Sequence, residues 1–252
     1  MEALDLAERL AEPVGTLGAS FYFDAGTRAR AHELGLNSLQ FYGLGRAGVM
    51  GDVDAARVVS TFAFFSASAI DTIWSQAKLV ADPVATAEEY LRAAYAFADR
   101  TFGALDANVL VAVAGAVRRV VDATARGRWA LVDGYRQYPV PENPVHGAYL
   151  AAILLRELRG GVHTDAVGEV GLDGATACYL ESVTYFNWHG FTDAEAPEVT
   201  DELRQRRVRA EALTNEKMAE HFNVLGDAAR EGLADGVFQM KRALSEPVAV
   251  TN

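Results

Sequence analysis

Three carboxylates stand inside stretches of sequence that are otherwise apolar, and they are the first candidates for chemistry. Asp71 follows a long uncharged run, Glu157 lies between leucines, and Glu181 sits in the segment ACYLESVTYF. Burying a lone charge costs free energy, so such a group is expected either to pair with an opposite charge or to take part in catalysis. Carboxyl groups in apolar surroundings have raised pKa values and can act as general acids or bases. The alternative is that they pair with an arginine and fix helix packing; the arginines available are Arg46, Arg156 and Arg159.

Two histidines complete the candidate proton-transfer groups. His163 follows a pair of glycines, and His189 lies in an aromatic turn beside Trp188. An imidazole changes charge near neutral pH, which favours a proton shuttle; helix capping and aromatic packing are the alternatives. His163 and Asp165 have the H-x-D spacing of some iron sites, but residues two apart on a helix point away from each other. We therefore predict no metal site. No dinucleotide or phosphate-loop fingerprint is present, so we also predict no cofactor.

A second group of residues has the chemistry to bind a substrate. Arg46 stands among four glycines, which would let the backbone approach a ligand closely. Its guanidinium would hold an anionic group while an acid, a base or a histidine moves a proton. Aromatic side chains would line the rest of the pocket, together with Trp74. The predicted substrate-binding residues are Arg46, Arg159, Tyr149, Tyr185, Trp188 and His189.

The stretch from Asn143 to Gly174 must position much of this chemistry. Asn143 is a suitable N-cap, and Pro144 fits the first position of a helix. Residues 145–155 carry no formal charge, which indicates a helix in the centre of a core. Gly160 and Gly161 predict the end of that helix. A short helix over 162–170, a turn over 171–174 and a helix through 184 would then give the outline of a helix-turn-helix unit.

The remainder of the chain also predicts helices, so the expected fold class is all-α. Helices are expected over 2–10, 24–34, 38–44, 55–78, 83–102 and 105–124. Thr192 and Glu195 form a capping box for a helix that ends in an excursion over 208–213, and a last helix covers 214–232. That order resembles a winged helix with a shortened wing. The proline-rich crossover predicts two helical halves, 1–135 and 136–252, that form one compact unit and are related to each other, although no clear repeat is visible.

Several segments resemble a family of actinomycete proteins that are catalogued as helix-turn-helix proteins and called SalK-like. They are LLRELRGG-V-H at 154–163, YF at 22–23, FYGLGRAG at 41–48, TFAFF at 61–65 and LT at 213–214. The resemblance covers about residues 21–232 and implies a helix-turn-helix fold and a role in secondary metabolism. This chain has Tyr149-Leu150 where the family has Trp-His, and Leu158-Arg159-Gly160-Gly161 where it has His-Arg-Gly-Asp. It therefore works without the histidines of those two positions.

Composition narrows the classes of function. The chain has 252 residues, half of them hydrophobic, and a formal net charge of −11, which argues against a polyanionic partner. Cys178 is the single cysteine, so a disulfide within the chain or a thiolate zinc site is excluded, and we expect Cys178 to be buried. The acidic N-terminus does not have the pattern of a signal peptide, and the longest uncharged run, residues 58–70, is too short to span a membrane. We expect a cytoplasmic protein that does not bind membranes.

Three interpretations of the function follow. The first, which we favour, is a cofactor-independent enzyme of actinomycete secondary metabolism. It would process an anionic small molecule by acid- and base-assisted cyclisation, elimination or intramolecular displacement. Its predicted catalytic residues are Glu157, Glu181, His163 and Asp71.

The second interpretation is a DNA-binding regulator with a ligand pocket, supported by the basic run RQRRVR at 204–209. The acids around that run argue against DNA as a partner, because they would repel its phosphates. The third is a non-catalytic partner subunit in a homodimer or a heteromer. It would use apolar positions of the last helices, for which ordinary core packing is the alternative; they are Phe222, Leu225, Leu233, Val237, Phe238 and Met240.

Overall fold

The computed structural model describes residues 1–245, and within that range every regular element is a helix. The all-α prediction is confirmed. None of these helices is long and apolar enough to cross a membrane. The elements are α1 (Ala3–Ala19), α2 (Ala25–Glu33), α3 (Ser38–Ala47), η1 (Gly48–Met50), α4 (Ala55–Thr61), α5 (Ala67–Lys78), α6 (Pro83–Phe102), α7 (Ala107–Ala123), α8 (Ala130–Arg136), α9 (Pro144–Glu169), α10 (Gly174–Glu181), α11 (Val183–Trp188), η2 (Asp193–Glu195), α12 (Asp201–Phe222) and α13 (Asp227–Ser245).

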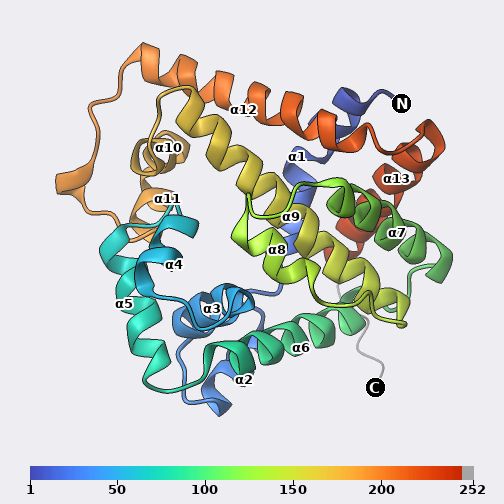
Figure 1. Cartoon of the computed structure of the whole chain (residues 1–252), viewed down its shortest axis with the longest axis horizontal. Helices are drawn as coiled ribbons and strands as arrows, with labels where there is room; N and C mark the ends of the chain where they lie inside the picture. The colour runs from blue at the N-terminus through green and yellow to red at the C-terminus, as the bar shows by residue number, and fades with distance from the viewer. Residues whose placement is uncertain (246–252) are drawn as a thin grey trace.

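Helix α9 is the axis around which the other helices are arranged. Figure 1 shows it running diagonally through the molecule, and it packs against α1, α6, α7, α8 and α12. Its start is the predicted one: the Asn143 side chain accepts a hydrogen bond from the Val145 N–H, and Pro144 opens the first turn. Residues 147–155 of this helix are all buried, as the uncharged run predicts.

The predicted end of α9 at Gly160–Gly161 is wrong. The helix continues through both glycines to Glu169, and it ends where Gly171 adopts a φ of 74° that favours glycine. Gly161 serves packing instead, because a Cβ atom there would lie 2.6 Å from the Trp129 ring. The side chain of Trp129 therefore rests directly on the backbone of α9.

The predicted helix over 55–78 is also wrong, because it is broken into α4 and α5. The intervening segment, residues 62–66, turns so that Phe62 and Phe65 both enter the core. The Ser66 N–H donates to the His189 carbonyl oxygen at 2.9 Å, which ties this segment to the end of α11. Backbone polar groups that leave a helix need such partners, and here the partner lies far away in the sequence.

Near the C-terminus, the predicted excursion over 208–213 does not occur. Helix α12 is continuous, because Ala210, Thr214, Met218 and Phe222 recur every four residues and are all buried. Thr214, where the last helix was expected to begin, therefore lies inside α12. The Thr192–Glu195 capping box is present, but it caps only η2, and Thr200 caps α12.

The helix-turn-helix outline is found at α9, the turn at Gly171 and α10. The Leu172 N–H donates to the Val167 carbonyl oxygen, and the Asp173 side chain caps α10. Ser182 then ends α10 and caps the short helix α11. The connection from α11 to α12 holds η2, and residues 1–245 contain no strand of a wing.

One hydrophobic core contains side chains from both sides of residue 135, from Leu6 to Met240. Relatedness of the two predicted halves stays a prediction; residues 246–252 of the second half lie outside the described residues. The apolar positions proposed as a partner surface are part of this core, fully buried except for Phe238, so they do not form a free surface. They complete the packing of α12 and α13 against α1 and α7.

Candidate functional site

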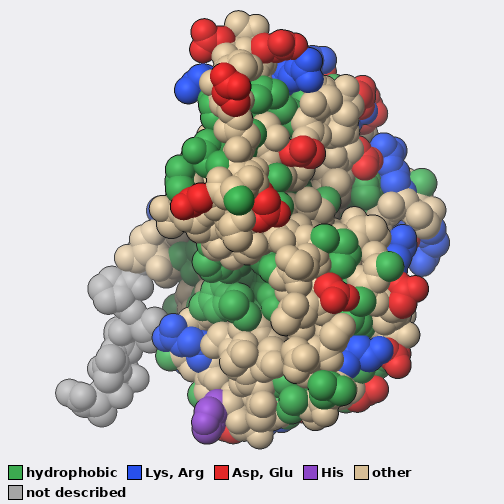
Figure 2. Space-filling view, turned by 90° about the vertical axis from the view of Figure 1, so that its left-hand side faces the viewer, with side chains coloured by type: hydrophobic (Ala, Val, Ile, Leu, Met, Phe, Trp, Pro, Cys, Tyr) green, Lys and Arg blue, Asp and Glu red, His purple; other side chains and the backbone are tan. Residues whose placement is uncertain are grey.

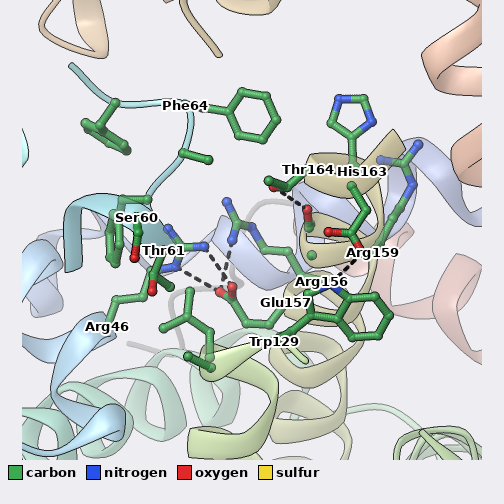
Figure 3. A pocket seen from close by; sticks show the side chains of 18 of the residues that line it. Arg46, Ser60, Thr61, Phe64, Trp129, Arg156, Glu157, Arg159, His163 and Thr164 are labelled. Atoms are coloured by element: carbon green, nitrogen blue, oxygen red, sulfur yellow. Dashed lines mark hydrogen bonds and ion pairs between the residues drawn. The ribbon is translucent and has the colours of Figure 1, made fainter. Parts of the chain in front are cut away.

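A cavity of about 410 Å³ lies beside the middle of α9. Its walls come from α1, α3, α4, segment 62–66, the start of α8 and α11, so they are drawn from segments spread between residues 14 and 189. Figure 3 shows Phe64 reaching in from segment 62–66 on one side and Trp129 on the other, with the charged side chains between them. Its volume lies within the ~300–1,000 Å³ that small-molecule sites occupy.

The cavity is cationic although the chain is acidic. Five arginines and two acidic residues line it, and Glu211 beside the cavity balances one further arginine, which leaves two more positive than negative charges in a chain with a formal net charge of −11. Two of the arginines are paired at the edge: Arg128 with Asp165 at 2.8 Å, and Arg159 with Glu211 at 2.9 Å. The remaining charged lining residues are Arg46, Arg57, Arg156 and Glu157.

Glu157 lies at the floor of the cavity between two guanidinium groups (Figure 3). Its Oε1 accepts from Arg46 Nε at 2.9 Å and from Arg156 Nη1 at 3.0 Å, and its Oε2 accepts from Arg46 Nη2 at 2.7 Å. Burial alone would raise the pKa of this carboxyl, but the two guanidinium charges and their hydrogen bonds outweigh it and hold the pKa below its ordinary value. Glu157 is therefore ionised with both oxygens engaged, which favours a positioning role over proton transfer.

The two arginines differ in which of their N–H donors have no hydrogen-bond partner. Arg46 uses Nε and Nη2 on Glu157, and its Nη1 donates to the Tyr42 hydroxyl at 2.8 Å. Arg156 donates only through Nη1, so its Nε and Nη2 have no hydrogen-bond partner among residues 1–245. Both of these atoms remain accessible to solvent. The Arg156 guanidinium also lies 5.1 Å over the Tyr22 ring.

Gly18 on α1 lets the backbone approach Arg156 closely. A Cβ atom at this position would lie 2.6 Å from the Arg156 Cβ. The position of the Arg156 stem is thus set by the α1–α9 contact, which the sequence did not indicate.

The two predicted histidines both line the cavity, and both are held in one tautomer by a carbonyl or hydroxyl oxygen. His163 Nδ1 lies 2.9 Å from the Thr214 hydroxyl, whose own proton goes to the Ala210 carbonyl, so Nδ1 carries the hydrogen. His189 Nδ1 lies 2.7 Å from the Tyr185 carbonyl oxygen and carries its hydrogen for the same reason. In each ring the lone pair is therefore on Nε2.

Burial keeps these imidazoles uncharged. It lowers the pKa of His163 to about 4. The negative charge of Glu211 opposes this shift, and the positive charges of Arg159 and Arg207 add to it. Burial also lowers the pKa of His189, against its hydrogen bond to the Tyr185 carbonyl. Near neutral pH both rings are neutral and can accept a proton or a hydrogen bond through Nε2.

The structure brings six of the ten predicted site residues to this cavity: Arg46, Glu157, Arg159, His163, Tyr185 and His189. Asp71 is exposed on α5, because the helical phase that buries Ile70 and Trp74 turns it outward. Glu181 is 54% exposed and pairs with Arg207 at 2.7 Å. For Asp71 and Glu181 the expected apolar surroundings were therefore wrong.

The other two residues are aromatic. Tyr149 is fully buried in the core, where its hydroxyl bonds Ser20 and the Leu17 carbonyl oxygen. Trp188 is 45% exposed on α11 and packs against Phe23, outside the cavity. Trp74, the further expected lining residue, is also buried in the core.

Sequence reasoning missed several residues of the cavity. It placed Arg57 and Phe64 inside one long helix, and it gave Trp129 no role in the crossover. The signals available were the aromatic run TFAFF and the basic residues on each side of Trp129, which show a type of side chain but not a location. The missed lining residues with polar or aromatic side chains include Tyr42, Arg57, Phe64, Arg128, Trp129, Arg156 and Asp165.

The basic run at 204–209 is neutralised. Each of its four arginines is paired with a carboxylate, as Arg206 is with Glu202 at 2.6 Å and Arg209 with Glu216 at 2.6 Å. Residues 160–203, which include the turn, α10 and α11, contain no lysine or arginine but nine acidic residues. Figure 2, which views the side that carries α11 and the connection to α12, shows acidic side chains at its upper end with lysine or arginine side chains beside them. Such a surface repels phosphates.

Comparison with known proteins gives one match. The model of the Helix-turn-helix family matches residues 7–196, which contain every residue that lines the cavity. No curated protein and no solved structure matches the chain.

Proposed function

The chain belongs to the Helix-turn-helix family, and we propose that it uses this scaffold to bind a small anionic molecule in the arginine-rich cavity and to process it by proton transfer, without a cofactor. The observation that carries the proposal is the excess of positive charge inside the cavity of an acidic protein. Positive charges gathered in a partly buried space repel one another and destabilise the ligand-free protein. A bound anion relieves this repulsion, so such a cavity favours an anionic ligand.

The two neutral imidazoles support the chemical step. His163 and His189 both line the cavity and each has an unprotonated Nε2, that of His163 lying 3.7 Å from Glu211 Oε1, and the guanidinium groups of the cavity would stabilise developing negative charge. Such a pair of features fits an elimination, a cyclisation or an intramolecular displacement that needs only a base and an anion clamp. The resemblance to SalK-like actinomycete proteins supports a substrate from secondary metabolism.

Family membership favours a second candidate, a DNA-binding regulator that senses the same ligand. The charge distribution opposes it, because residues 160–203, which hold the turn, α10 and α11, contain no lysine or arginine and the arginines of α12 are paired. Phosphate contacts supply most of the affinity of non-specific DNA binding, and this surface offers few of them.

The experiment that tests the proposal is native mass spectrometry of the protein taken from its producing cells, followed by denaturation to identify the released molecule. We expect a molecule that is anionic at neutral pH. The Arg57→Glu variant puts a negative charge at the exposed edge of the cavity and is expected to retain less of it, whereas Arg204→Glu, at an exposed arginine on α12, retains as much as the unaltered protein. A neutral or cationic ligand, or equal retention by both variants, would contradict the proposal.

A second step separates an enzyme from a binding protein. The identified molecule is incubated with the purified protein in buffer alone and followed by chromatography and mass spectrometry. We expect conversion to a product, and slower conversion by the His189→Gln variant. An unchanged molecule at every protein concentration would leave ligand binding standing and remove the enzymatic part of the proposal.

A further inference from the structure

We propose that the ligand of this cavity is a monocarboxylic acid with a flat aromatic body, and that the Nε–Nη2 edge of Arg156 binds its carboxylate. This inference rests on the proposed function and names the class of substrate. Three features of the cavity lead to it: the free edge of one guanidinium, the charge at the floor, and the aromatic walls.

The hydrogen bonds at the floor leave a single open guanidinium edge. Arg46 presents its Nε–Nη2 edge to Glu157 and its Nη1 to the Tyr42 hydroxyl, so it is already saturated as a bidentate donor. Arg156 binds Glu157 through Nη1 alone, and its Nε and Nη2 are the donors left over. This edge presents two parallel N–H groups, which match the two coplanar oxygens of a carboxylate.

The charge at the floor fits a monoanion. Arg46 and Arg156 contribute two positive charges and Glu157 one negative charge, which leaves one positive charge to be balanced. Arg128 and Arg159 are balanced by Asp165 and Glu211. Arg57 is exposed at the edge, where water screens it, so it favours the approach of an anion more than it holds one. A phosphate dianion at the floor would leave an excess negative charge in a poorly solvated site.

The walls fit a flat apolar body. Phe64, Trp129 and Tyr185 line the cavity and are each only partly covered by other side chains. Phe64 is stacked on the His163 ring with centroids 5.6 Å apart, and Trp129 is backed by Gly161. Gly160 presents bare backbone to the same space, with nothing within 4 Å of where its Cβ would lie. Flat rings pack well against such surfaces, and the cavity of about 410 Å³ suits one or two rings.

The test is calorimetric titration of the full chain with four probes of defined chemistry. They are indole-3-acetate, its neutral isostere indole-3-acetamide, phenyl phosphate, and acetate, which has no aromatic body. We expect indole-3-acetate to bind at least tenfold more tightly than each of the other three. Because this comparison uses the unaltered protein, it does not depend on the folding of any variant.

Substitution at Arg156 then assigns the donor. Arg156→Lys keeps the charge but removes the two-donor edge, and we expect it to weaken the binding of indole-3-acetate at least tenfold. Arg204→Lys, which makes the same change at an exposed arginine of α12 outside the cavity, is expected to change it less than threefold. Unfolding midpoints of both variants show whether the fold is kept.

The outcomes separate this inference from the proposed function. Tighter binding of phenyl phosphate than of indole-3-acetate, binding of the amide as tight as that of the acid, or unchanged binding by Arg156→Lys would overturn the assignment of a carboxylate to Arg156. In the phosphate case the anion-binding function itself would survive. Failure of every anion to bind would overturn both.

Discussion

Arg46 on α3 and Glu157 on α9 lie 111 positions apart in the sequence, yet they share two parallel hydrogen bonds of 2.9 and 2.7 Å. The Arg46 guanidinium also lies 4.7 Å over the Phe62 ring, so the same side chain contacts the segment that breaks α4 from α5. This pair joins three parts of the chain that together form the floor and one wall of the cavity.

The first prediction concerns the free energy of unfolding. Glu157→Gln leaves two partly buried guanidinium groups without a counter-charge, so we expect a loss of about 3 to 5 kcal/mol in urea titration. The matched control is Glu181→Gln, which breaks an exposed pair and is expected to cost less than about 1 kcal/mol. Similar losses for the two variants would show that the floor of the cavity is not held by this pair.

The second prediction concerns pH. Because the pKa of His163 is about 4 in the folded chain and about 6.5 when the ring is free, the unfolded chain binds more protons between these values. Stability due to this group is therefore complete above pH 6.5 and is lost as the pH falls towards 4. The loss by pH 4.5 is about 2 to 3 kcal/mol.

The variant that isolates this effect is His163→Asn, whose amide can still donate to Thr214. The charged groups around the ring, Glu211, Arg159 and Arg207, remain in place. We expect the stability difference between the wild-type protein and the variant to shrink by about 2 kcal/mol between pH 7 and pH 4.5. A difference that stays constant over this range would mean that His163 is not buried in its neutral form.

The sequence predicted the helices whose pattern is local. The start of α9 followed from Asn143 and Pro144, and its burial followed from an uncharged run, because both depend on neighbours in the chain. The end of α9 did not follow from Gly160 and Gly161. A glycine pair ends a helix or permits close packing, and only the position of Trp129 decides between them.

The sequence predicted the kinds of side chain in the candidate site but not which residues of each kind line the cavity. Charge inside apolar sequence pointed to Arg46 and Glu157, which both line the cavity, whereas the same pattern at Asp71 belongs to an exposed side chain that the phase of α5 turns outward. The sequence also did not decide the role of Glu157. Proton transfer and pairing with an arginine were both open, and the three hydrogen bonds to its carboxylate favour pairing. Long-range pairs of this kind leave no trace in the spacing of residues.

The third prediction concerns DNA. In a mobility-shift assay with random duplexes at about 0.1 M salt we expect no binding at micromolar protein, since residues 160–203 carry nine acids and no lysine or arginine. Glu202→Gln and Glu216→Gln together release Arg206 and Arg209 from their partners and serve as a positive control, because weak salt-sensitive binding should then appear. Tight, salt-sensitive binding by the wild-type protein would favour the regulator over the proposed function.

The last prediction uses two adjacent glycines of α9 that have opposite surroundings. Gly160→Ala places a methyl group where nothing lies within 4 Å, so only the helix propensity changes, and we expect a gain of about 0.5 to 1 kcal/mol. Gly161→Ala places its methyl group 2.6 Å from the Trp129 ring, and we expect a net loss of about 1 to 3 kcal/mol because the indole must move.

Gly168→Ala is the control within the same helix, since its surroundings are also open and it lies outside the cavity. It should give the same gain as Gly160→Ala in urea unfolding. Only Gly161→Ala should also shift the Trp129 fluorescence, because displacement of the ring changes its contact with α9. A gain at all three positions would mean that Trp129 does not rest on the α9 backbone, and the wall it forms for the cavity would then have to be assigned to another side chain.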